Sequence, residues 1–360
     1  MMKMNKWTMA LAAAGVVSLS SVAQAQEAVA GAEAEAASGT LTGYVSTSYT
    51  MVKDGVAPAG YWNANANSDG YALDVIDLKW ASAQGGGEYA TGYTVELWAG
   101  GADFGNGVGT VEIMEANIDL RVPLGSGLNL KVGYFGTVVG AETFNYNDNA
   151  FYSRSFGFQV EPTHHTGILA SYQVSEDLTV KFGVANDTTN NAVNAGTGTG
   201  GTAYLANIQY TLPDSLGPLG GASFEYGTVW SAGTGTGETD THYLGLAVPV
   251  PGVEGLTYAL AWDIVERDGT QVGDGVVGHY LSYAMNDKMT LNLRYETGNI
   301  NQGATVAFGA NQNLDGLESV TIGLDYKLWE NVTSRIEWRM DDADGVVDQE
   351  TLGINIIYSF

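Results

Sequence analysis

The chain ends at residues 350–360 with the sequence E-T-L-G-I-N-I-I-Y-S-F. Every second residue, counted back from the end, is large and apolar: Phe360, Tyr358, Ile356, Ile354 and Leu352. Because a strand points alternate side chains to opposite faces, these side chains share one apolar face. About 10 residues tilted by about 45° are enough to cross a bilayer. The stretch therefore has the length and the pattern of a transmembrane strand.

The same alternation runs through the rest of the chain from Gly39 onward. Strands are predicted at about 39–51, 71–83, 88–99, 110–122, 128–138, 164–174, 178–186, 204–212, 224–230, 240–249, 256–265, 276–285, 288–298, 318–328, 332–341 and 350–360. Short turns and longer breaks alternate between them. This pattern predicts an all-β fold, a transmembrane antiparallel up-and-down β-barrel of about 16 strands, with short periplasmic turns and longer external loops. Counts of about 14 to 18 strands remain compatible with it.

The amino-terminal residues have the features of a secretory signal peptide. Lys3 and Lys6 precede an apolar run at 10–22 and the small-residue site Ala-Gln-Ala at 23–25. The run is much shorter than the ~20 residues that a spanning helix needs. We therefore expect a signal peptide at 1–25, an Ala/Glu-rich periplasmic tail at 26–38 and a transmembrane barrel at 39–360.

Composition excludes several classes of site. The chain has no cysteine, so disulfides, thiolate metal sites and cysteine nucleophiles are absent. Its net charge of −26 argues against nucleic-acid binding. A mean hydropathy of −0.03 agrees with strands whose apolar and polar faces average out. No motif joins a Ser or Asp to the four histidines, and the adjacent His164 and His165 would point to opposite sides of a strand. We predict no enzyme activity, cofactor or metal site.

Basic residues of the predicted strands all fall on the polar face. A Lys or Arg facing lipid at the bilayer midplane would cost about 2–4 kcal/mol, so this segregation is expected of a membrane barrel. A soluble β-sandwich is the alternative, but it does not predict the many regular strands, the signal peptide and the aromatic end together. About sixteen strands leave room for an aqueous channel. The candidate pore-lining residues are Arg121, Lys131, Lys181, Arg294, Lys327, Arg335, Arg339, Glu96, Asp119, Glu296, Asp325 and Glu337.

The break at 139–163 is too long for an ordinary connection, and its aromatic residues argue against disorder. We expect it to fold into the barrel as a constriction loop, with Glu142, Asp148, Arg154 and Glu161 as candidate constriction residues. The basic residues of the last strands, Arg294, Lys327, Arg335 and Arg339, would face this loop and set up a transverse field across the pore. In the alternative, paired lumen charges only solvate and stiffen the wall.

Two runs resemble the OmpL-like outer-membrane porin family of Gram-negative bacteria: G-T-L-T-G-Y-V-S-T-S-Y at 39–49 and F-Y-S-R-S-F-G-F-Q-V-E-P-T-H-H-T-G-I-L-A-S-Y-Q-V at 151–174. The resemblance implies an integral protein of the outer membrane with a pore for small hydrophilic solutes. It also implies that Phe360, Tyr358 and Ile356 belong to a signal read by the barrel-assembly machinery. Homotrimer formation follows only by analogy with sixteen-stranded porins.

The function that fits best is a water-filled channel for passive diffusion of small hydrophilic solutes and ions. One alternative is a substrate-selective channel whose loop aromatics stack on sugars, and another is a non-conducting structural or adhesive barrel. The expected partners are outer-membrane lipid, lipopolysaccharide, the barrel-assembly machinery and the solutes. The acidic net charge favours cations, although salt screens charges in external loops.

Overall fold

The computed structural model describes residues 39–54, 69–100, 111–188, 202–231, 239–267, 274–300, 314–343 and 347–360. The expected signal peptide and tail, residues 1–38, lie outside the described residues. No helix in the described part of the chain is long and apolar enough to cross a membrane.

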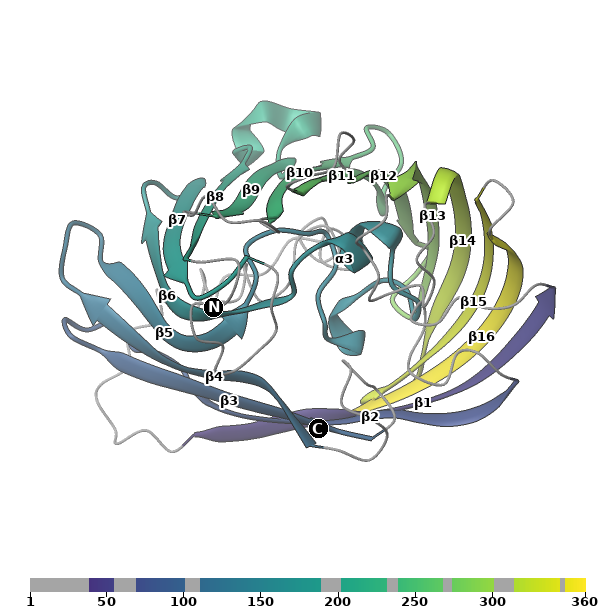
Figure 1. Ribbon diagram of the computed structural model, residues 1–360, viewed down its shortest axis with the longest axis horizontal. Helices are drawn as coiled ribbons and strands as arrows, with labels where there is room; N and C mark the ends of the chain where they lie inside the picture. The colour runs from purple at the N-terminus through teal and green to yellow at the C-terminus, as the bar shows by residue number, and fades with distance from the viewer. Residues whose placement is uncertain are drawn as a thin grey trace.

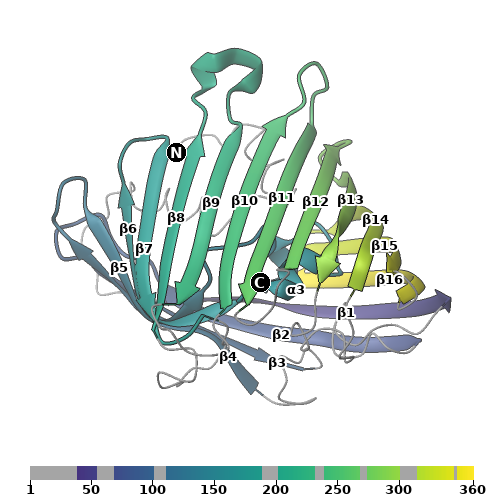
Figure 2. The ribbon, with the colours of Figure 1, turned by 45° about the horizontal axis from the view of Figure 1, so that its top comes forward.

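Sixteen antiparallel strands form a closed barrel (Figures 1 and 2). The first eight are β1 (Thr40–Asp54), β2 (Gly70–Ser82), β3 (Thr91–Ala99), β4 (Val111–Val122), β5 (Leu128–Gly136), β6 (His164–Gln173), β7 (Leu178–Ala185) and β8 (Ala203–Thr211). The others are β9 (Ser223–Ser231), β10 (Thr239–Pro249), β11 (Leu256–Arg267), β12 (Asp274–Ala284), β13 (Met289–Ile300), β14 (Leu314–Trp329), β15 (Val332–Ala343) and β16 (Val347–Ser359). Each strand pairs with its neighbours in sequence, and β1 pairs with β16. The predicted fold class is confirmed.

The last strand closes the barrel against the first. Ser48 pairs with Asn355 in the β1–β16 register. At the end of the chain, the Phe360 amide donates to the Gly43 carbonyl (2.9 Å), and the Gly43 amide donates to the Phe360 carbonyl (3.1 Å). This pairing leaves no open sheet edge, which a strand inside a bilayer could not tolerate.

The apolar faces of the strands point out of the barrel, as predicted. Ile356 and Tyr358 of β16 and the following Phe360 are exposed, whereas Thr351 and Asn355 are fully buried on the inner side. Trp80 and Phe182 show the same outward exposure on β2 and β7. The outer surface is therefore a continuous apolar band that suits a hydrocarbon environment.

Several register shifts interrupt the strand pairing, and two of them turn a side chain into the barrel. The register between β3 and β4 shifts at Glu96/Leu97, which inserts Met114 as an extra residue in β4. Strict alternation along β4 would place Met114 on the lipid face, but the bulge turns it into the barrel, where it is 3% exposed. A second shift between β1 and β2, at Ser46/Thr47, does the same to Asp74.

Candidate functional site: a loop clamped inside the barrel

The segment between β5 and β6, residues 137–163, folds into the barrel, where its helix α3 (Phe156–Val160) lies within the ring of strands (Figure 1). It also holds a short 3-10 helix, η1 (Tyr146–Asp148). Its aromatic rings are at most 9% exposed, and they belong to Phe144, Tyr146, Phe151, Tyr152, Phe156 and Phe158. The long predicted break is thus an ordered internal loop.

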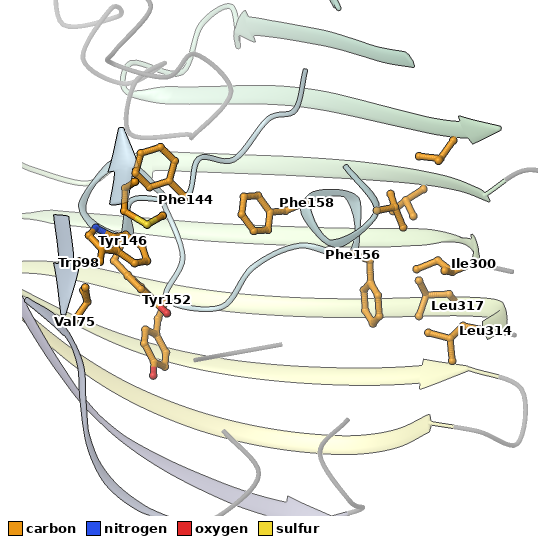
Figure 3. Close-up of a cluster of buried hydrophobic side chains, with 14 of the residues drawn as sticks. Val75, Trp98, Phe144, Tyr146, Tyr152, Phe156, Phe158, Ile300, Leu314 and Leu317 are labelled. Carbon is orange, nitrogen blue, oxygen red and sulfur yellow. The ribbon is translucent and has the colours of Figure 1, made fainter. Parts of the chain in front are cut away.

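Apolar packing fixes the loop at two places (Figure 3). Phe156 and Phe158 join a buried cluster with Leu314 and Leu317 on the inner face of β14. On the other side, Tyr146 stacks on Trp98 of β3, with a centroid distance of 5.8 Å. Burying an aromatic side chain of this size is worth about 1.5–3 kcal/mol. The loop therefore has a hydrophobic core of its own inside the barrel.

Arginines of the wall hold the carbonyl groups of the loop. Irregular backbone inside a barrel must find hydrogen-bond partners, because unpaired buried polar groups are costly. Arg335 of β15 donates to the carbonyls of Tyr146 and Asn149, both at 2.6 Å. Arg339, also of β15, donates to the carbonyl of Arg154 at 2.6 Å.

Carboxylates hold the amide groups of the same loop. Glu337 of β15 accepts from the Tyr152 amide at 2.8 Å. Glu296 of β13 accepts from the amide of Phe156 at 2.7 Å, at the start of α3. The side chains of β13 and β15 thus supply the hydrogen bonds that a helix or sheet would otherwise provide to this segment.

The contacts that side chains of β13 and β15 make with the loop are called the clamp below. Arg294 of β13 lies at its centre. Its guanidinium lies 2.7 Å from Glu142 of the loop and 3.1 Å from Glu296 of the wall. It also donates to the Ser153 hydroxyl at 2.9 Å and lies 4.7 Å from the centre of the Phe151 ring. The side chain is fully buried, so its charge is balanced by these carboxylates rather than by water.

The three arginines that were expected to form a basic wall of the pore are not exposed to water. Arg294, Arg335 and Arg339 are 0–5% exposed because the loop covers them. We expected these arginines to act across the pore; the structure instead places their guanidinium groups against loop carbonyls and neighbouring carboxylates, and the transverse field stays a prediction. Lys327 of β14, by contrast, is exposed.

The other pore-lining candidates lie in ion pairs or polar contacts. On the wall formed by β4, β5 and β7, Lys131 and Asp119 are partly exposed and lie 3.2 Å apart. Arg121 donates to the Asn129 side chain at 3.1 Å. Lys181 lies near Glu225 and Lys131. Two further candidates are buried or half-buried in ion pairs: Glu96 with Lys79, and Asp325 with Arg335.

The constriction candidates lie inside the loop. Arg154 donates to the Phe144 carbonyl at 2.5 Å and lies 4.4 Å from the centre of the Tyr146 ring, so it braces the loop internally. Burial raises the pKa of the Asp148 carboxyl group. Burial also raises the pKa of Glu161 well above its usual value, and the nearby Asp263 carboxylate adds to this shift. Glu142 is paired with Arg294, as described above.

The histidines near the loop take part in packing. His164 is 1% exposed, and its ring lies 4.5 Å from that of Phe144. The His165 Nε2 atom lies 2.9 Å from the Thr137 hydroxyl. Across the described ranges, no group of three or more His, Asp or Glu side chains could hold a metal ion.

One buried residue that contacts the loop could not be found from the sequence: Asp74 of β2, whose Oδ1 atom lies 3.1 Å from the Tyr152 hydroxyl. The period-two pattern of β2 places it on the lipid face, and the bulge that turns it inward has no sequence signal of its own. The only hint is that a carboxylate on a lipid face would be costly.

Similar proteins of known structure are outer-membrane barrels. The chain resembles the "High pH structure of Pseudomonas putida OprB" (TM-score 0.65, 14% identity, 89% of this chain and 94% of that chain covered). It also resembles the "Anion-selective porin from Comamonas acidovorans" (0.59, 16%, 90% and 100%) and OmpT of Vibrio cholerae in its trimer form (0.60, 13%, 91% and 100%). At these identities the likeness shows the fold alone.

A family model supplies the identity. None of the curated proteins compared matches the chain. The model of the family described as "Putative beta-barrel porin-2, OmpL-like" matches residues 36–360, a range that includes all sixteen strands. The protein is therefore an integral outer-membrane porin that forms a channel, and it belongs to this OmpL-like β-barrel porin family.

Proposed function

We propose that the channel is a passive diffusion path for small hydrophilic solutes and ions, and that it runs between the clamped loop and the wall of β4, β5 and β7. Lys131 and Asp119 of that wall keep part of their side chains exposed. Arg121 and Lys181 lie on the same wall and are half-buried. The observation that carries the proposal is the loop at 137–163, which wall side chains hold inside the barrel. We infer that this loop narrows the channel.

A sugar-selective channel is less well supported. Stacking on a sugar needs an accessible aromatic face, but the loop aromatics are at most 9% exposed. Their rings pack on one another and on the wall, as for Tyr146 on Trp98.

Planar-bilayer recording of the purified protein tests the proposal. We expect steady ohmic current steps that sugars do not block. Block by a particular solute would favour a substrate-selective channel instead. Silent membranes containing verified folded protein would favour a structural or adhesive barrel.

The wall of β4, β5 and β7 should influence ion selectivity. Lys181 lies in a polar part of this wall, next to Glu225 and Lys131. Lys181→Glu should therefore shift the reversal potential in a KCl gradient towards cations. The matched control is Lys288→Glu, which makes the same charge change at an exposed position in a short turn. Equal shifts in the two variants would show that total charge, and not this wall, sets selectivity.

We propose that Ile356, Tyr358 and Phe360 form an assembly signal for the barrel-assembly machinery. Deleting Phe360 removes both backbone hydrogen bonds to Gly43 at the closing seam. We expect the amount of folded protein in membranes to fall severalfold, while the molecules that do fold keep the wild-type single-channel conductance. Membrane yield measured by the gel-mobility shift on heating, beside a Phe360→Tyr control, checks this. A normal yield of the deletion variant would contradict the role of this residue.

We further propose export by cleavage after residue 25 and a short Ala/Glu-rich tail at 26–38, in accord with the sequence pattern. A homotrimer is proposed because one structure with this fold is described in a trimer form. We propose contacts with lipid and lipopolysaccharide on the apolar outer band, and no catalytic role.

A further inference from the structure

Asp74 is a buried carboxylate at a bulge in β2. Ser46 pairs with Val75 and Thr47 pairs with Leu73, so Asp74 is the extra residue between them. Both Asp74 and Val75 are fully buried inside the barrel. A bulge is a usual means of redirecting one side chain of a strand. Here the bulge turns the Asp74 carboxylate into the barrel, whereas strict alternation would have turned it towards lipid.

Polar groups from three other segments meet at this carboxylate. Oδ1 accepts from the Ser48 hydroxyl (2.7 Å) and lies 3.1 Å from the Tyr152 hydroxyl. Oδ2 accepts from the Ser46 hydroxyl (2.7 Å) and from the Asn355 side-chain amide (3.0 Å). Hydrogen bonds from these donors favour the charged form of a buried carboxylate and offset part of the penalty that burial imposes on it.

Two of those segments form the seam of the barrel. Ser46 and Ser48 belong to β1, and Asn355 belongs to β16, directly opposite Ser48. Asn355 also donates to the Ser46 hydroxyl at 2.8 Å and to the Thr47 carbonyl at 3.2 Å. This set of donors is complete only when the first and last strands have paired.

The third segment is the internal loop. The Tyr152 hydroxyl lies 2.8 Å from the Ser48 hydroxyl as well as 3.1 Å from Asp74. At its other end, the Tyr152 amide donates to Glu337 of β15. Tyr152 is 1% exposed, so it spans from β15 to the seam through the buried interior.

We propose that Asp74 is a positioning residue that ties the channel loop to the closing seam of the barrel. The loop docks fully only on a barrel whose β1 and β16 have paired, and the width of the channel then depends on this contact. The proposal deepens the proposed function, since it rests on the loop at 137–163 narrowing a conducting channel.

Tyr152→Phe tests the link between loop and seam with little other disturbance. It removes only the hydroxyl and leaves the serines, Asn355 and Asp74 in place. Amide hydrogen exchange in residues 144–158 should become about tenfold faster, as expected for the loss of a hydrogen bond to a charged group. Open-channel current noise should rise severalfold. The temperature at which heating unfolds the barrel and changes its gel mobility should stay at the wild-type value, because the seam is intact.

The matched control is Tyr243→Phe. Tyr243 of β10 is also fully buried inside the barrel, and its hydroxyl has no hydrogen-bond partner among the described residues. This variant should keep wild-type exchange and noise. Asp74→Asn, by contrast, should both speed the exchange of the loop and lower the temperature of the gel-mobility shift, because it weakens loop and seam together.

Equal exchange in Tyr152→Phe and Tyr243→Phe would overturn the proposal, whether both equal the wild type or both exceed it. Hydrogen exchange is measured without any current, so it tests the contact between the loop and the seam independently of conduction. A wild-type protein that is folded but silent in bilayers would refute the proposed function, while the exchange comparison would still decide the role of Asp74.

Discussion

Arg294→Ala should lower the free energy of unfolding by about 3–5 kcal/mol, the usual cost of removing one partner from a buried ion pair. The substitution leaves Glu142 and Glu296 buried without their shared guanidinium. It also leaves the Ser153 hydroxyl and carbonyl without their donor. Equilibrium urea unfolding of the protein in detergent micelles measures the change.

Lys327→Ala is the control for this prediction. It also removes a cation from the barrel wall, on the neighbouring strand β14, but Lys327 is exposed. Its effect should stay within about 0.5 kcal/mol, as is usual for surface substitutions. If Arg294→Ala and Lys327→Ala have the same unfolding midpoint, the clamp does not hold the loop as we describe.

Deletion of residues 144–158, bridged by a short glycine linker, should raise the single-channel conductance severalfold. The deleted segment carries α3's first residues and the loop aromatics, which pack across the interior from Trp98 to Leu317. Arg335 and Glu337 would then meet water, which a polar lumen tolerates. Planar-bilayer recording at fixed salt concentration gives the conductance.

Asn147→Ala is the control within the same loop. Asn147 is exposed, and its hydrogen bond with Ser359 is long, at 3.5 Å. This variant should conduct like the wild type. An unchanged conductance in the deletion variant, with the barrel still folded, would show that the loop does not limit the current.

The candidate site could be predicted from the sequence only in part. The length and the aromatic content of the break after β5 correctly indicated an ordered internal loop. The contacts of the wall arginines could not be predicted from the sequence, because an inward-facing arginine has the same sequence pattern whether it faces water or a buried carbonyl. Arg335 and Tyr146, which form one such contact, lie 189 residues apart.

The sequence by itself determined the strands, their two faces and hence the barrel. A period of two residues is a local property, and one apolar face per strand leaves few arrangements that bury every backbone group in a bilayer. The tertiary structure alone decided where the loop docks, which charges it covers, and which residues the bulges at Asp74 and Met114 turn inward. These features depend on side-chain contacts and strand registers that the local pattern of residues does not encode.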